Sequence, residues 1–143
     1  MRNAKLVIPR TRYDEIIAHC RSRYPKEACG ILAGSREQGA GSEGTLVQVY
    51  SMRNVEDSPI GYSMDPKEQL LIEKQMRMSG QRMIGIFHSH TATDAYPSPV
   101  DVRLSISPDI SYVLVSLKHL DEPVIKSYRI DGARVTEEPV EIG

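Results

Sequence analysis

Two histidines, a serine and an aspartate stand in a fixed pattern in the second half of the chain. The pattern is His88-x-His90, seven residues, Ser98, two residues, Asp101. Side chains alternate along a strand, so histidines one residue apart at the end of an apolar strand face the same side. Two imidazoles and one carboxylate are the protein ligands of a zinc ion that keeps its fourth position open for water. Such an ion lowers the pKa of its bound water to about 7, and the pattern therefore predicts a hydrolase.

A hydrolytic site also needs a base for the proton of the attacking water, and Glu27 is the best candidate. It precedes an apolar run at residues 28–33, and a carboxylate beside such a run is unusual without a partner. Taken alone, Glu27 is better explained as the last polar residue before a strand. Together with the downstream pattern, the base becomes the favoured interpretation.

The residues of the pattern must be held by a strand and a helix that meet. Residues 82–87 are an apolar stretch that predicts a strand ending at the histidines. Ser98 before Pro99 is a helix start, because serine caps the free backbone N–H groups and proline suits the first helical position. We therefore expect Asp101 in the first turn of a short helix that reaches about Ser105.

Two longer helices are expected elsewhere. Asp65 before Pro66 predicts a helix over residues 67–78. An apolar stripe at helical spacing predicts an earlier helix that Thr11 and Asp14 cap and that Pro25 ends. The stripe consists of Tyr13, Ile16, Ile17, Cys20 and Tyr24.

The remaining elements are strands and loops. Further strands are expected at residues 6–8, 28–33, 45–50, 111–117 and 124–130, with an edge strand within 133–142. Residues 34–44, rich in Gly and Ser, predict an exposed loop, and residues 61–64 a short extended piece. This order predicts an α/β fold with one domain over residues 1–143, a layered sandwich in which helices flank a central mixed sheet.

Composition excludes several classes of function. The 143 residues hold 18 basic and 19 acidic side chains, for a net charge of −1, and these are interspersed. We therefore expect neither nucleic acid nor a membrane surface as partner. No apolar run is long enough to span a bilayer or to act as a signal peptide. Two cysteines outside any Cys-x-x-Cys pair predict a reduced, cytoplasmic protein.

Glu27 followed by His88-x-His90-x7-Ser98-x2-Asp101 resembles the JAMM signature of zinc metallopeptidases with the MPN fold, a cytidine-deaminase-like sandwich. The resemblance covers most of the chain and the signature is complete. It implies that His88, His90 and Asp101 hold one Zn²⁺ per chain. It also implies that Glu27 accepts the proton of the water and returns it to the leaving amine, and that Ser98 donates to the oxyanion.

A narrower resemblance links residues 88–98, 112–116 and 127–130 to short bacterial JAMM peptidases of cysteine biosynthesis. It implies a small ubiquitin-like sulfur-carrier protein as partner, from whose Gly-Gly tail the enzyme releases cysteine. An extended Gly-Gly tail can pair with a strand edge, and residues 61–64 are a candidate edge. A JAMM isopeptidase on other ubiquitin-like conjugates and a non-catalytic MPN scaffold remain alternatives. A zinc deaminase is excluded, because its His-x-Glu and Pro-Cys-x-x-Cys motifs are absent.

Other chemically capable side chains receive less prominent roles. His19 and His119 are expected at the surface, and Cys29 is expected as a small core residue rather than a nucleophile. Asp94 and Tyr96 are expected to shape substrate contacts rather than to bind metal, with solvated loop residues as the alternative. The methionines at positions 76, 78 and 83 are expected in the core.

Overall fold

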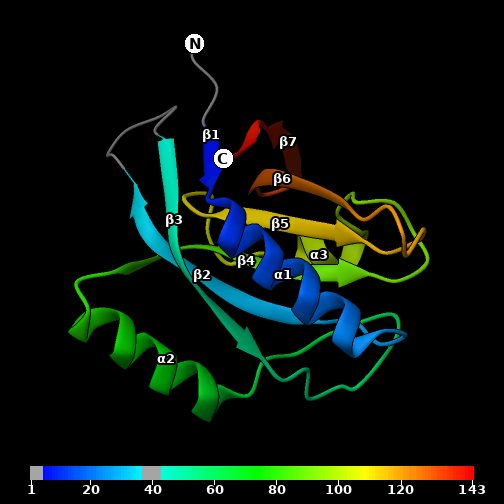
Figure 1. Cartoon of the computed structure of the whole chain (residues 1–143), viewed down its shortest axis with the longest axis horizontal. Helices are drawn as coiled ribbons and strands as arrows, with labels where there is room; N and C mark the ends of the chain where they lie inside the picture. Colours follow the sequence, from blue (N-terminus) through cyan, green and yellow to red (C-terminus); the bar gives the residue numbers. More distant parts are fainter. Residues whose placement is uncertain (1–4, 37–42) are drawn as a thin grey trace.

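A computed structural model describes residues 5–36 and 43–143, which form three helices and eight strands (Figure 1). The elements in chain order are β1 Lys5–Ile8, α1 Arg10–Arg23, β2 Cys29–Arg36, β3 Glu43–Met52, α2 Pro66–Met78, β4 Arg82–His90, α3 Pro99–Arg103, β5 Ser111–Ser116, β6 Val124–Asp131, β7 Arg134–Glu138 and β8 Val140–Ile142. The predicted α/β class with a central mixed sheet and flanking helices is confirmed.

The strands form one mixed sheet in the order β7-β6-β5-β4-β2-β3-β1-β8. The pairs β4–β5, β1–β3 and β1–β8 are parallel, and the others are antiparallel. Strands β7 and β8 lie at opposite ends of this order, yet only Pro139 separates them in the chain. The sheet must therefore curve until its two ends approach, and the Leu6 N–H donates to the Pro139 carbonyl at 3.0 Å.

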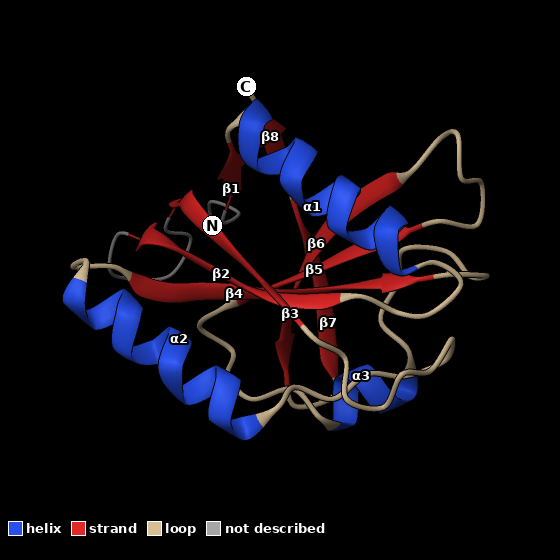
Figure 2. Cartoon of the chain, turned by 60° about the horizontal axis from the view of Figure 1, so that its bottom comes forward, coloured by secondary structure: helices blue, strands red, loops and turns tan. Residues whose placement is uncertain are grey.

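Helix α1 covers one face of the sheet, and α2 and α3 lie on the other (Figure 2). Ile16, Ile17 and Cys20 are the buried residues of α1, and they pack on the apolar face of the sheet that includes Leu32, Phe87 and Val113. Side chains of α1 and of the sheet together form the largest part of the hydrophobic core here.

The opposite face of the sheet carries two helices, α2 and α3. Ile72 and Met76 of α2 pack on Cys29, Ile31 and Ala33 of β2. Farther along the sheet, toward α3, Ile86, Tyr112 and Ile130 form a separate apolar cluster. Asp65 starts α2 as predicted, because its side chain accepts from the Lys67 N–H at 3.1 Å. The predicted site residues line a cavity on this face that α3 borders.

Several sequence expectations require correction. Helix α1 begins at Arg10 after Pro9 and has no side-chain cap, so the predicted Thr11 and Asp14 cap is wrong. The loop predicted at 34–44 is too long, because the β2–β3 pairing extends to Arg36 and Gly44. Of this predicted loop, residues 37–42 lie outside the described residues.

At the carboxyl end, the expected single edge strand over 133–142 is two strands, β7 and β8, since proline interrupts a ladder. Helix α3 ends at Arg103 rather than at about Ser105. Among the methionines, Met76 is buried as predicted, but Met78 is 78% exposed and does not belong to the core.

Candidate metal centre

His88 and His90 lie at the end of β4, the strand that β2 and β5 flank on either side. The register of β2 with β4 shifts at Leu32, which faces Gly85 while the next residue faces Met83, so that Ile84 is an extra residue. This bulge resets the alternation of side chains. Ile84 consequently joins the core under α1, whereas both histidines line the cavity on the other side of the sheet.

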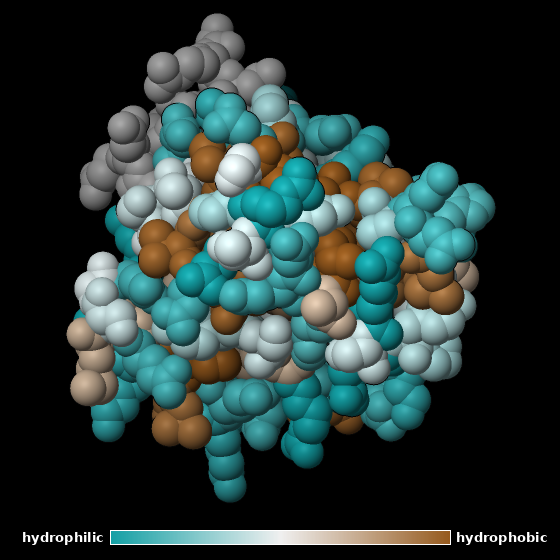
Figure 3. Space-filling view, in the orientation of Figure 1, coloured by the Kyte–Doolittle hydropathy of each residue, from teal (hydrophilic) through white to brown (hydrophobic). Residues whose placement is uncertain are grey.

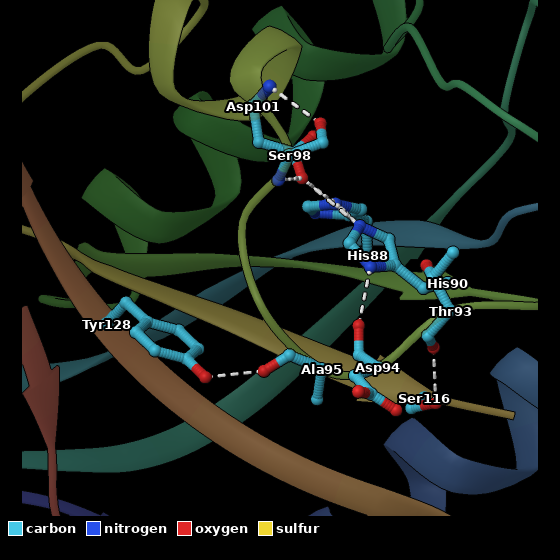
Figure 4. A network of polar contacts seen from close by, with 9 residues as sticks. All are labelled: His88, His90, Thr93, Asp94, Ala95, Ser98, Asp101, Ser116 and Tyr128. Carbon is cyan, nitrogen blue, oxygen red and sulfur yellow. Dashed lines mark hydrogen bonds and ion pairs between the residues drawn. The ribbon is translucent and has the colours of Figure 1, made fainter. Parts of the chain in front are cut away.

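Asp101 reaches the histidines from the first turn of α3. A capping box fixes this turn: the Asp101 N–H donates to Ser98 Oγ at 3.1 Å, and the Ser98 N–H donates to Asp101 Oδ2 at 2.9 Å (Figure 4). The same Oδ2 lies 3.2 Å from His88 Nε2 and 3.1 Å from His90 Nε2. The helix cap therefore orients the carboxylate toward both imidazoles.

The three ligand atoms fit a tetrahedral metal ion. His88 Nε2 and His90 Nε2 lie 3.2 Å apart, so the three atoms form a triangle with sides of 3.1 to 3.2 Å. A tetrahedral zinc ion with bonds of 2.0 to 2.1 Å requires ligand atoms separated by about 3.3 Å. His88, His90 and Asp101 are thus a group that could hold a metal ion, with one coordination position left for a small ligand.

The pKa shifts of His88 and Asp101 favour the neutral imidazole and the charged carboxylate that a bound cation needs, whereas without a metal His90 is shifted toward its charged form. Burial lowers the pKa of His88, which favours the neutral imidazole that a metal needs. Burial acts to raise the pKa of Asp101, but the hydrogen bonds from His88 and His90 outweigh it and hold the pKa below its usual range. For His90, burial acts to lower the pKa, and the hydrogen bonds to Asp101 and Asp94 raise it by more.

The neighbouring groups orient the two rings. His90 Nδ1 donates to the Asp94 carbonyl at 2.9 Å, which leaves Nε2 free for a metal. The ring of His88 stacks on Tyr62, with 4.5 Å between centroids and 26° between planes. The loop after His90 is fastened by hydrogen bonds from Ser116 to the Thr93 carbonyl and from Tyr128 to the Ala95 carbonyl, as Figure 4 shows.

Glu27 lines the same cavity as the three ligands. Its side chain is buried, and burial raises the pKa of the carboxyl to about 7, while the nearby His90 opposes the rise and Asp101 adds to it. Among the described residues, no hydrogen bond to its side chain is present, so both carboxylate oxygens remain available. A carboxyl with a pKa near 7 can both accept and release a proton at neutral pH.

The cavity has a volume of about 720 Å³, and the three ligands, Glu27 and Ser98 share its lining. Glu56 and the segment from Ser58 to Tyr62 belong to the same lining. Ile86 of β4, Leu114 of β5 and Ile130 of β6 contribute apolar surface, together with Val100 and Leu104. A cavity of this size and lining can accept part of an extended peptide beside the ligand group.

The other side chains considered from the sequence lie outside the ligand group. Asp94 and Tyr96 are exposed and do not line the cavity; Asp94 acts through its backbone carbonyl, and Tyr96 packs edge-on against Tyr128. His119 is exposed and Cys29 is buried, as predicted.

His19 was expected at the surface, but it is half-buried. Its Nε2 lies 3.2 Å from the Cys29 carbonyl of β2, and its ring meets the Phe87 ring of β4 edge-on. Sequence reasoning also missed Asn54 and the stacking of Tyr62 on His88, both in the β3–α2 connection, where no periodicity distinguishes a residue.

Known proteins resemble this chain over nearly its whole length. A family described as prokaryotic homologs of the JAB domain matches residues 9–131. The chain is 42% identical over 137 residues to the CysO-cysteine peptidase of Mycobacterium tuberculosis (strain ATCC 25618 / H37Rv), which covers 96% of this chain and 90% of that protein. It is 34% identical over 99 residues to a probable TtuB-protein conjugate cleaving protease of Thermus thermophilus, with 68% of this chain and 62% of that protein covered.

Among solved structures, protein DSY2949 from Desulfitobacterium hafniense superimposes with a TM-score of 0.87 and 40% identity, and the match covers 96% of this chain and 92% of that one. These likenesses confirm the predicted family, fold class and peptidase class. With the signature Glu27, His88, His90, Ser98 and Asp101 gathered around one cavity, the chain belongs to the prokaryotic JAB-domain family of the JAMM peptidases.

Proposed function

We propose that this protein is a zinc peptidase that hydrolyses the bond after the C-terminal Gly-Gly of a ubiquitin-like sulfur carrier and releases cysteine. The observation that carries the proposal is the ligand triangle of His88, His90 and Asp101 with a buried carboxyl, Glu27, in the same cavity. The 42% identity to a CysO-cysteine peptidase supports cysteine as the leaving group.

Each residue has a defined task in this proposal. His88, His90 and Asp101 hold the zinc ion, which when bound lowers the pKa of a water to about 7 and polarises the scissile carbonyl. Glu27 accepts the proton of the water as its oxygen attacks the carbonyl carbon, and then gives that proton to the leaving amine. The Ser98 hydroxyl donates to the oxyanion while its oxygen keeps accepting from the Asp101 N–H, since a hydroxyl has one proton and two lone pairs.

The segment around Tyr62 is suited to hold the tail of the substrate. The Val55 N–H donates to the Ser63 carbonyl at 2.9 Å, so residue 63 faces the neighbouring chain. In extended backbone the preceding residue faces the opposite way, so the backbone N–H and carbonyl of Tyr62 would turn from that chain toward the cavity. A Gly-Gly tail has no side chains and could pair there as an added strand.

A second candidate function is cleavage of other ubiquitin-like conjugates. The likeness to a conjugate cleaving protease favours it, and the open cavity would admit an isopeptide. A non-catalytic scaffold is disfavoured, because all five signature residues are present.

Intact-mass analysis tests these functions. A ubiquitin-like carrier ending Gly-Gly-Cys is incubated with zinc-loaded protein, and Glu27→Gln serves as the control. Loss of one cysteine with the wild type only would support both reaction and substrate class. An intact carrier, together with cleavage of an isopeptide-linked conjugate, would replace the first function by the second. If neither the carrier nor the conjugate were cleaved, the non-catalytic scaffold would be the remaining function.

Charge and hydropathy support a carrier protein, rather than a polyanion or a membrane, as partner. Hydrophilic side chains predominate on the face that Figure 3 shows, and apolar ones form small separate patches. Among the described helices, none has the length and apolarity needed to cross a bilayer. Both cysteines are buried and unpaired, which supports a cytoplasmic site of action.

A further inference from the structure

Asn54 is a buried amide in the connection between β3 and α2, with only 4% of its surface exposed. Its Nδ2 donates to the Glu27 carbonyl at 3.1 Å and to the Gly61 carbonyl at 2.9 Å. Its Oδ1 accepts from the backbone N–H groups of Glu56 at 3.1 Å and Ser63 at 3.0 Å. One side chain thus joins the residue that bears the candidate base to both ends of the segment at the cavity wall.

The chemistry of the four partners settles the orientation of the amide. Carbonyl groups can only accept and backbone N–H groups can only donate, so the nitrogen must face Glu27 and Gly61. The side chain uses two donors and two acceptor positions, which is its full capacity. No other side chain of this size offers two donors and two acceptor positions in one plane without a charge.

Glu27 depends on such external contacts because it lies outside the strand that follows it. Its N–H donates to the Ser58 carbonyl at 2.8 Å, and its carbonyl accepts from Asn54. The next residue, Ala28, donates to Ser89 Oγ at 2.8 Å and accepts from the Ser89 N–H at 3.0 Å. Since Ser89 stands between His88 and His90, the backbone at Glu27 is fixed to the metal strand on one side and to the 54–63 segment on the other.

We propose that Asn54 is a positioning residue that sets the distance of Glu27 from the metal and aligns the 61–63 segment with it. This inference rests on the proposed function. The Glu27 carboxylate has no side-chain donor to hold it among the described residues, so its position follows its backbone. A displacement of about 1 Å of a catalytic group can cost about a hundredfold in rate.

Asn54→Asp is the sharpest variant, because it keeps the size and the two acceptor bonds but loses both donors. A buried carboxylate would also face the Glu27 and Gly61 carbonyls without a proton to share. We expect kcat on the Gly-Gly-Cys carrier to fall about tenfold or more, while the zinc dissociation constant stays within about twofold, since Asn54 touches none of the three ligands.

Glu138→Gln is the matched control. Glu138 is 3% exposed and accepts from Ser111, Ser127 and Arg129 in β5 and β6, away from the cavity. It should lower the melting temperature as Asn54→Asp does but leave kcat unchanged. An unchanged kcat in Asn54→Asp, or a loss of zinc in parallel with kcat, would overturn the positioning role. If Asn54→Asp does not fold, Asn54→Ala takes its place with the same expectations.

A crystal structure of the zinc-loaded variant separates this inference from the proposed function. The Glu27 carboxyl should be displaced relative to His90, whether or not any carrier is cleaved. If the wild type cleaves no Gly-Gly substrate, the proposed function fails, while an unmoved Glu27 in the variant would refute the role of Asn54 independently.

Discussion

Replacing Glu27 by glutamine should make the protein less active and, without metal, more stable. The variant keeps the size of the side chain and removes its ionisation. Loss of a general base lowers turnover by about a hundredfold to ten-thousandfold. The same carboxyl is buried at a cost that glutamine avoids, so activity and stability should change in opposite directions.

The stability change can be worked out from the pKa of Glu27. Burial raises it from 4.5 to about 7. The native state therefore keeps its proton up to about pH 7, whereas the unfolded chain releases it near 4.5. Wild-type stability should fall as the pH rises through this window and then level off. The full rise in the pKa of Glu27 corresponds to a loss of about 3 kcal/mol in the free energy of unfolding. Solvent in the open cavity screens the carboxyl and reduces this loss to about 1 to 2 kcal/mol.

Urea unfolding of chelator-treated protein at several pH values between about 4.5 and 8 measures this difference. Glu27→Gln should match the wild type at the acid end and exceed it by about 1 to 2 kcal/mol at about pH 8. Glu56→Gln, which removes an exposed carboxylate from the same cavity, should stay within about 0.5 kcal/mol. If the free energy of unfolding varied with pH in the same way for Glu27→Gln and the wild type, the raised pKa of Glu27 would be refuted. A normal turnover rate in Glu27→Gln would refute its role as the base.

Three further predictions concern the metal, pH and packing. Asp101→Ala should lose bound zinc in a metal assay, whereas Asp94→Ala should keep it because only the Asp94 backbone meets His90; equal loss would contradict the ligand set. Burial lowers the pKa of His19, so the metal-free wild type should lose more stability than His19→Gln as the pH falls below about 6.5, and identical pH slopes in urea unfolding would refute this. A Cβ at Gly30 would lie 2.2 Å from Phe87 Cε1 and 2.6 Å from the Tyr50 carbonyl oxygen, so Gly30→Ala should cost about 1 to 3 kcal/mol in the same assay; an unchanged urea midpoint would contradict that packing.

The ligand pattern is predictable from sequence because both of its halves are local. Two histidines at strand spacing share a face, and a serine and an aspartate three residues apart form a capping box around a helix start. The start of α2 at Asp65 and Pro66 is predictable for the same reason. In each case the residues that interact lie within one turn or one strand.

Asn54 could not be predicted, because its partners lie 27 residues upstream and up to nine residues downstream in irregular backbone. The burial of His19 depends on its contacts with Cys29 and Phe87 of the sheet, which no helical pattern contains. Met78 follows the helix formers of α2 but lies past its last buried residue, Met76, so composition alone misplaces it. Contacts between segments far apart in the chain could not be predicted from the sequence.

The connection from β7 through Pro139 to β8 has a consequence for how the protein fails. Residues 134–143 cover β6 at one end of the sheet and β1 at the other. Detachment of this one segment would expose the backbone N–H and carbonyl groups of β6 and of β1 at the same time. The present end strands, β7 and β8, are short and rich in charge, which protects a sheet edge from pairing with other molecules. A proteolytic cut near Pro139 would separate β7 from β8, so that each would then be held only by its own neighbour and could detach independently of the other.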